Sequence, residues 1–397
     1  MNPVRLLEAI APQGPRYLQA LLAWGALTVL GGAFLVPQRV WPMVLMASYG
    51  LICLGLAGGF FVALQYVTGS TWCIAIRRVP EAMTAALPAG ALGLALLFLV
   101  RPHLYPWFGD QAHFTATEWF KAAWLSPAFF FARSVTYVLV WLLLIRRLVG
   151  ASRQQDGTGD PALTAGNRRR SAVFIVVFTL TFWPACFDWI MSLEPHWYST
   201  IFGVYNFAGL FLSGLAVMAI LLVWLLERER GLPARNQRLR GVVTSQHLVD
   251  LGRLMGAFST FWAYTWFSQY MLIWYANLPE ETGYFIHRLK PDWAPLFVAN
   301  LALNWTVPFL LLLPRATKQN PRALAGIALI VLLGRLLDLY LMVAPPFAGS
   351  SPVFGLWELG VLAGAGAVFA LVFRLAIEQA QPVPVGDPQL QESLHYH

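Results

Sequence analysis

Charged residues are scarce in this chain of 397 residues. Only 12% of them are Asp, Glu, Lys or Arg, whereas 58% are hydrophobic, and the mean hydropathy is +0.60. Soluble globular domains carry about 25% charged residues, so this composition excludes an ordinary water-soluble enzyme. The chain is instead rich in aromatic residues, with 17 Trp, 27 Phe and 13 Tyr, and aromatic rings settle at membrane–water boundaries. We therefore predict a polytopic membrane protein.

Residue patterns that hold redox groups are also missing. The three cysteines, Cys53, Cys73 and Cys186, form no CxxC pair, which excludes a disulfide framework, a zinc site and the attachment of haem c. No two histidines fall inside facing predicted spans, so haem b held by two histidines is excluded, and no Walker or Rossmann glycine pattern occurs in the right context. The sequence thus predicts a polypeptide without a cofactor of its own. Any electron transfer would involve partners or a diffusible carrier.

Long apolar runs are abundant, and each of ten is long enough to span a membrane. About 20 mostly apolar residues cross the hydrocarbon layer of a bilayer. This predicts an all-α integral membrane fold with ten transmembrane helices. The predicted spans are 17–36, 41–67, 83–100, 123–145, 172–193, 201–226, 254–276, 294–313, 323–343 and 353–373.

The basic residues indicate how the spans are oriented. Of the 27 Lys and Arg residues, twenty fall on one side and five on the opposite side, while Arg133 and Arg335 lie inside spans. Cytoplasmic loops of membrane proteins carry the excess of Lys and Arg, so both termini are predicted to be cytoplasmic. We attribute the net charge of +8 to this topology and to contact with the lipid bilayer, and we expect no binding to nucleic acid.

No segment between the spans is long enough for a soluble catalytic domain. We predict one ten-helix transmembrane domain over residues 1–377 and a polar cytoplasmic tail over residues 378–397. The segment 151–170, rich in Gly, Asp and Arg, is expected to be a mobile loop. The topology permits two groups of four helices, spans 2–5 and spans 6–9, as in transporters built from parallel repeats.

Ionisable side chains inside the spans are the main functional candidates, because each costs on the order of 2.5–3.5 kcal/mol at the centre of a membrane helix. Arg335 and Asp338 are three residues apart and therefore share one face of span 9. Arg133 lies in the middle of span 4, and Asp188 and Glu358 lie in the outer parts of spans 5 and 10. A functional role for these positions is the first hypothesis to test.

These residues fit a relay that carries protons across the membrane. On the outer side the relay would include Asp188 and Glu194, with His196 able to titrate near neutral pH. On the inner side it would begin at the mouth of span 7. Buried ion pairs and interhelical hydrogen bonds use the same residue types, so a structural role is the alternative. The candidates for proton transfer are Asp188, Glu194, His196, Arg335, Asp338, Glu358, His247, Asp250, Tyr264, Gln269 and Tyr270; no catalytic residue or metal ligand is predicted.

Two long motifs resemble one known family. The stretches 182–203 (FWPACFDWIMSLEPHWYSTIFG) and 268–282 (SQYMLIWYANLPEET) are similar to the F subunit of bacterial alternative complex III, a quinol:electron-acceptor oxidoreductase. The tail segment 387–394 (DPQLQESL) is similar too, and the resemblance covers essentially the whole chain from residue 72 onward. By motif match it implies functional roles for Asp188, Glu194, His196, Gln269 and Tyr270.

The resemblance implies a fold, a location and a set of partners. The F subunit is an NrfD-type, polysulfide-reductase-like subunit with two four-helix bundles and two peripheral helices, and it carries no cofactor. It lies in the bacterial inner membrane beside a homologous ten-span C subunit that oxidises quinol, an iron–sulfur subunit, haem c subunits and small membrane subunits. The implied function is a cofactor-free subunit of the respiratory complex that supports assembly, and for which proton conduction has been proposed.

Two other functions are open on the sequence alone. A stand-alone secondary transporter would place its site at the midplane, near Arg133 and Arg335, although most prolines lie at or near span ends rather than in broken spans. A quinone-binding subunit in its own right would need a proton acceptor. Asp188 could serve as that acceptor, because no span contains a suitable histidine.

Overall fold

The chain is a multi-pass membrane protein built from long helices. The computed structural model describes residues 16–109, 118–230, 239 and 241–396, and no strand occurs among them. Within this part, nine helical stretches are long and apolar enough to cross a membrane. They are α2 (Arg16–Leu35), α3 (Pro37–Thr68), Ile74–Val100, α7 (Pro127–Thr158), Pro161–Leu193, α9 (Phe202–Glu229), Ala294–Leu312, α15 (Pro321–Val343) and α17 (Leu356–Glu378).

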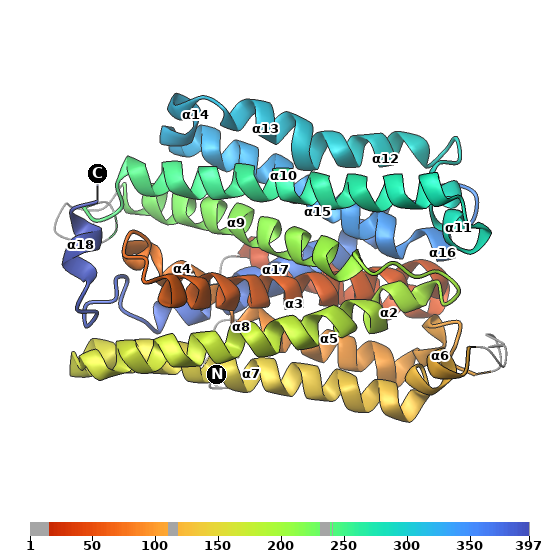
Figure 1. Ribbon diagram of the computed structural model, residues 1–397, viewed down its shortest axis with the longest axis horizontal. Coiled ribbons are helices and arrows are strands. Elements are labelled where there is room, and N and C mark those ends of the chain that lie inside the picture. The colour runs from red at the N-terminus through yellow and green to blue at the C-terminus, as the bar shows by residue number, and fades with distance from the viewer. Residues whose placement is uncertain (1–15, 110–117, 231–238, 240, 397) are drawn as a thin grey trace.

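Three of these stretches contain more than one element, and shorter helices connect the spans. Another long helix, α10 (Ser245–Ala276), runs beside α9 and contains the span predicted over 254–276 (Figure 1). The remaining elements are η1 (Ile74–Ile76), α4 (Arg78–Met83), α5 (Ala86–Val100), η2 (Pro102–Leu104), α6 (Trp119–Trp124), α8 (Pro161–Trp189), η4 (Met191–Leu193), α11 (Pro279–Arg288), α12 (Ala294–Leu301), η6 (Ala302–Thr306), α13 (Val307–Leu312), α14 (Arg315–Gln319), α16 (Pro345–Ala348) and α18 (Leu390–Leu394).

The long helices run side by side in one elongated bundle (Figure 1). We call the end that carries α18 the tail end, and the opposite end, which carries α11 and α6, the α11 end. The first turn of α2 and the last turns of α17 lie at the same end, because Tyr17 and Leu18 line one cavity together with Phe373 and Arg374. The first and the last long helix of the described chain therefore begin and finish, respectively, at the same end of the bundle.

The two most buried helices, α3 and α9, pack against each other at the centre of the bundle. On one side of them, α3 packs against α5 and α8, and α7 packs against α8. On the other side, α9 packs against α10 and α15, and α12 packs against α15 (Figure 1). The helix pair α2 and α17 lies on the flank of α3. The predicted groups 2–5 and 6–9 correspond to the helices on these two sides.

The prediction of a mobile loop over residues 151–170 is wrong. Helix α7 continues to Thr158, Gly159 turns the chain with a φ of 63°, and α8 begins at Pro161. Asp160 caps α8 by accepting a hydrogen bond from the Ala162 amide at 2.9 Å. The segment is polar and yet helical on both sides of the turn, because polarity alone does not distinguish an extended helix from a loop.

The polar tail, as far as Tyr396, packs across the tail end. Asp387 pairs with the guanidinium of Arg77 at 2.6 Å, and both side chains are buried. The Ser393 hydroxyl accepts a hydrogen bond from the Ala75 amide and donates one to the Trp72 carbonyl, each at 3.1 Å. The tail is thereby fixed to the chain that precedes α4.

Candidate functional site

The first buried carboxylate, Asp188, lies in the last turn of α8. Arg133 on α7 donates two hydrogen bonds to it, from Nε to Oδ2 at 3.0 Å and from Nη2 to Oδ1 at 2.8 Å. The Tyr137 hydroxyl donates to Oδ2 at 3.1 Å, and the Trp124 indole donates to Oδ1 at 2.7 Å. Both oxygens of the carboxylate therefore accept two hydrogen bonds each, and its acceptor capacity is filled.

Aromatic rings complete the surroundings of this ion pair. The guanidinium carbon of Arg133 lies 4.0 Å from the ring centroid of Trp124 and 4.2 Å from that of Phe129. Asp188 is 0% exposed. A bidentate, stacked pair of this kind is geometrically specific, so the Asp188 centre holds α6, α7 and α8 together at the α11 end.

The second buried carboxylate, Asp338, lies on α15 and collects partners from four helices. Arg335, one turn earlier on the same helix, donates from Nη1 to Oδ2 at 2.5 Å. Asn300 of α12 donates to Oδ1 at 2.7 Å, and Trp262 of α10 donates to Oδ2 at 3.3 Å. The hydroxyl of Tyr205, on α9, also donates to Oδ1. Arg335 and Asp338 therefore share one face of α15, as their spacing predicts, and they form the buried ion pair that was the structural alternative to a proton relay.

A π-helical turn, η6, extends this network toward the tail end. Asn304 lies in η6 and donates to the Oδ1 atom of Asn300 at 2.7 Å. The wide turn directs the Asn304 carbonyl to α10, where the Ser259 hydroxyl donates to it at 2.5 Å. Such turns are rare and occur often at functional sites. Asp338, Asn300, Asn304 and Ser259 therefore form one continuous buried chain of polar groups.

Toward the α11 end, Asp338 borders a small cavity of about 20 Å³ that also touches Tyr205, Gln269 and Arg288. This volume has room for one water molecule. The Oε1 atom of Gln269 is buried and has no protein partner, so a water molecule there would satisfy it. At the outer edge, Arg288 donates to Glu194 at 2.8 Å, and the Glu194 side chain is 23% exposed. The cavity thus separates Asp338 from Arg288, the residue that holds the partly exposed Glu194.

Asp188 and Asp338 occupy corresponding positions in the two groups of helices. Asp188 is on the last long helix of the group that begins with α3, and Asp338 is on the last long helix of the group that begins with α9. Each is paired with an arginine and bonded by one tyrosine and one tryptophan. The difference is access: the small cavity touches Asp338 and not Asp188.

Four of the other predicted residues make no hydrogen bond to Asp338. They are Glu358, His196, Tyr264 and Tyr270. Glu358 is buried, accepts two hydrogen bonds from Arg39 at 2.8 Å each, and caps α17. His196 is exposed. The Tyr264 side chain faces outward and is 63% exposed, and the Tyr270 ring packs against Trp266.

His247 and Asp250 lie at the tail end, in the first turns of α10. The Nδ1 atom of His247 accepts a hydrogen bond from the Thr244 amide at 3.1 Å, which makes a capping box. The imidazole is covered by Trp72 and Tyr396, and this burial lowers the pKa of His247 below its ordinary value. The Tyr396 hydroxyl donates to Asp250 at 2.8 Å, which together with the burial raises the pKa of that tyrosine. Both residues help to bind the tail.

A buried charged cluster at the tail end was not predicted. Arg78 pairs with Glu81 on α4 and, at 2.5 Å, with Asp156 on α7. The Ser152 hydroxyl donates to Glu81 at 2.5 Å. In the sequence, Arg78 was used only to orient the spans. The buried cluster could still have been suspected, because Glu81 follows a proline within an apolar run. Tyr205, Asn300, Asn304 and Arg288 were also missed, because their importance depends on helices that meet only in the fold.

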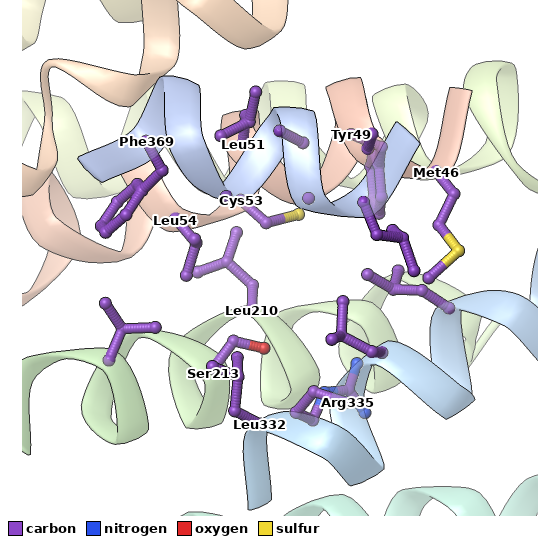
Figure 2. A pocket seen from close by; sticks show the side chains of 18 of the residues that line it. Met46, Tyr49, Leu51, Cys53, Leu54, Leu210, Ser213, Leu332, Arg335 and Phe369 are labelled. Carbon is purple, nitrogen blue, oxygen red and sulfur yellow. The ribbon is translucent and has the colours of Figure 1, made fainter. Parts of the chain in front are cut away.

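A larger cavity, of about 350 Å³, lies near the middle of the bundle between α3, α9, α15 and α17. Figure 2 shows Met46, Cys53 and Leu54 facing Leu210 and Ser213 of α9, with Arg335 at the edge of the space. Most of its lining is apolar. The guanidinium that binds Asp338 therefore also borders an oily cavity.

Comparisons with known proteins assign no function. No model of a protein family matches the chain, and no curated protein matches it. Among the described residues, no group of three or more His, Cys, Asp or Glu side chains is placed to hold a metal ion. The functional argument therefore rests on the residues themselves.

Proposed function

We propose that this chain is a cofactor-free membrane subunit of a quinol-oxidising electron-transfer complex, similar to the F subunit of bacterial alternative complex III, and that it conducts protons through the Asp338 centre. The similarity of segments 182–203 and 268–282 to that subunit supports the first part. The proposed partners are a homologous ten-span C subunit that oxidises quinol, an iron–sulfur subunit, haem c subunits and small membrane subunits. The proposed location is the bacterial inner membrane.

In this proposal α10 is the tenth span and the tail end is cytoplasmic. Helix α10 has 32 residues, and large apolar side chains such as Phe267, Leu272 and Trp274 face outward from it. Its polar residues Ser259 and Gln269 are buried and face the bundle. The mean hydropathy of α10 is therefore lowered by groups that lipid would not touch. The excess of Lys and Arg on the side of the tail supports the orientation.

One observation carries the proton part of the proposal: Asp338 is buried and ionisable, and it borders a water-sized cavity whose wall includes Arg288, the partner of the partly exposed Glu194. Glu194 would receive or release protons at the α11 end, and a water molecule held by Gln269 would bridge the distance. Arg335 stabilises the negative charge of Asp338 between transfers. The Tyr205 hydroxyl and the Asn300 amide both donate to Oδ1 and fix the orientation of the carboxylate, so that the proton always arrives at the same place.

The buried chain of polar groups stops at Ser259 and does not reach the tail end. Beyond Ser259, the face of α10 that is buried in the bundle carries Met255, Gly252 and Leu251. From Ser259 to Gly252, where the aliphatic part of the buried Lys318 side chain makes contact, α10 rises by about 10 Å. An apolar layer of this thickness stops protons at rest. Conduction would require it to open, which is how a coupled subunit avoids a leak.

The test compares two variants in the assembled complex in lipid vesicles. Asp338→Asn is expected to lower the number of protons moved per electron while quinol oxidation continues. Because the Asp338→Asn substitution would leave Arg335 as an uncompensated buried charge, the double variant Arg335→Gln with Asp338→Asn is the matched control for folding. The double variant should assemble normally and still fail to move protons. Full proton movement in the well-assembled double variant would overturn the proposal.

One observation favours the transporter alternative: the 350 Å³ cavity lies at mid-length of the helices and is bordered by Arg335. Arg133, the other predicted midplane residue, is engaged with Asp188 instead. An apolar lining suits neither ions nor sugars. Uptake by vesicles that contain this chain alone would support transport, and its absence together with co-purified redox partners would support the subunit.

A further inference from the structure

A groove leads from the 350 Å³ cavity to the tail end. A second cavity, of about 730 Å³, is bounded by α2, α9 and α17. The two cavities share three lining residues: Ile220, Leu221 and Phe369. They are therefore adjoining parts of one depression, which we call the α9–α17 groove.

The groove has the length and surface of an acyl-chain site. From Ser213, in its deep part, to Arg228, at its end, helix α9 rises by about 22 Å. One leaflet of a bilayer contributes about 15 Å of hydrocarbon, so a chain that starts near Arg228 would end within the deep part. The walls along this length include Leu221, Leu336 and Phe369.

The tail end of the groove is basic. Arg228 and Arg374 both line it, and Arg228 lies over the ring of Trp224 at 5.6 Å from the centroid. Arg374 also pairs with Glu378 at 2.8 Å, in a bridge whose two side chains are 38% and 47% exposed. An exposed bridge of this kind holds its arginine weakly. A phosphate between the two arginines would complement their charge.

Most polar groups of the deep part already have hydrogen-bond partners within the protein, so few remain to bind the polar ring of a ligand. The Tyr49 hydroxyl donates to Asn206 at 2.9 Å, and the Ser213 hydroxyl donates to the Gly209 carbonyl at 2.7 Å. Arg335 binds Asp338, although its buried Nε atom makes no hydrogen bond. This arrangement favours a hydrocarbon chain over a quinone head group in the deep part.

We propose that the α9–α17 groove binds one anionic phospholipid, with the phosphate between Arg228 and Arg374 and one acyl chain along Phe369 into the 350 Å³ cavity. This site goes beyond the proposed function and does not depend on it. A Cβ atom added at Gly366 meets no atom within 4 Å, so that glycine keeps the deep part of the groove open. The groove can therefore be filled by substitution without a backbone clash.

Two pairs of variants test the head and the tail of the lipid separately. Arg228→Gln with Arg374→Gln removes the phosphate site, and Arg146→Gln with Arg169→Gln removes the same charge from exposed positions on α7 and α8. Gly366→Leu fills the deep part, and Gly326→Leu is its control, because Gly326 also has open space around it but does not line the groove.

The measurement is native mass spectrometry of the purified protein titrated with phosphatidylglycerol or phosphatidylcholine of identical acyl chains. We expect one tightly held phosphatidylglycerol, preferred about tenfold or more over phosphatidylcholine, because arginines near a membrane surface attract anionic lipids. The preference should vanish in Arg228→Gln/Arg374→Gln, and retention of either lipid should fall in Gly366→Leu. Both control variants should bind as the unaltered chain does.

Three outcomes would overturn the proposal. Equal binding of the two lipids would exclude the phosphate site. Unchanged binding in Gly366→Leu would exclude the acyl-chain site. Recovery of one quinone per chain in the organic extract, lost in Gly366→Leu, would assign the groove to a different ligand. Elution of each variant at the size of the unaltered chain verifies folding, and the two variants act at opposite ends, so misfolding of one leaves the other decisive.

Discussion

Arg133 binds Asp188 through two parallel hydrogen bonds, Nε to Oδ2 at 3.0 Å and Nη2 to Oδ1 at 2.8 Å. In the other half of the bundle, a single nitrogen of Arg335 reaches Asp338. Each carboxylate accepts four hydrogen bonds, but only Asp338 borders the small cavity from which a water molecule could deliver a proton. We therefore assign a structural role to the Asp188 centre and propose that the Asp338 centre exchanges protons.

This difference predicts that Asp188→Asn destabilises the protein. Loss of the negative charge leaves the guanidinium of Arg133 buried and uncompensated, at a cost of about 3–5 kcal/mol. Thermal unfolding in detergent measures the effect. Arg133→Met with Asp188→Leu removes both charges and should recover most of the stability. If Asp188→Asn unfolds like the unaltered chain but stops proton movement, the structural assignment of Asp188 is wrong.

Gln269→Leu is predicted to lower proton movement per electron without lowering stability. The leucine would fill the small cavity beside Asp338 and remove the amide that would hold a water molecule there. Protons moved per electron are counted in vesicles that contain the assembled complex. Thr265→Val is the control, because its buried hydroxyl only donates to the Trp262 carbonyl of the same helix. Equal effects of both variants would exclude a specific role for the cavity.

The C-terminal tail is predicted to loosen as the pH falls. Burial lowers the pKa of His247, so the docked state binds a proton less readily than the undocked state, whose histidine titrates near 6.5. Stability of the docked tail is therefore complete above about pH 6.5 and falls as the pH is lowered below that value. Two charged groups lie near His247. They are Asp250 and Arg253, and they form an ion pair with each other at 2.8 Å.

Limited proteolysis of the tail between pH 7.5 and 5 measures this effect. His247→Gln is the matched variant, because a glutamine at this position of a helix can keep the capping box without titrating. Tail cleavage in His247→Gln should depend less on pH than in the unaltered chain. An identical acceleration at low pH in both proteins would assign the change to other groups.

Gly25→Ala is predicted to push α2 away from α17. An added Cβ atom would lie 2.5 Å from the Cα atom of Gly364, which is backbone and cannot move aside cheaply. The expected cost is about 1–3 kcal/mol, visible as faster proteolytic release of α2 in detergent. Gly31→Ala, on the same helix, places its Cβ at 3.7 Å from the Trp357 ring and should be tolerated. Equal release of α2 from both variants would contradict this packing.

The sequence predicted the positions of the helices better than it predicted where the helices end and which helices contact one another. Apolar runs located the long helices, but they could not show that α7 and α8 extend through the polar segment 151–170, where a capping Asp160 and a left-handed Gly159 set the turn. Spacing placed Arg335 and Asp338 on one face, because that relation is local to a helix. Tyr205 and Asn300 complete the centre from positions far away in the chain, and no local pattern shows such a meeting.

The most direct test of the central claim is purification of the chain from native membranes in a gentle detergent, with a redox difference spectrum and mass spectrometry of the eluate. The account predicts haem c bands, an iron–sulfur protein and a second ten-span subunit that co-purify with this chain. A colourless protein without partners, obtained from intact membranes under mild conditions, would contradict it.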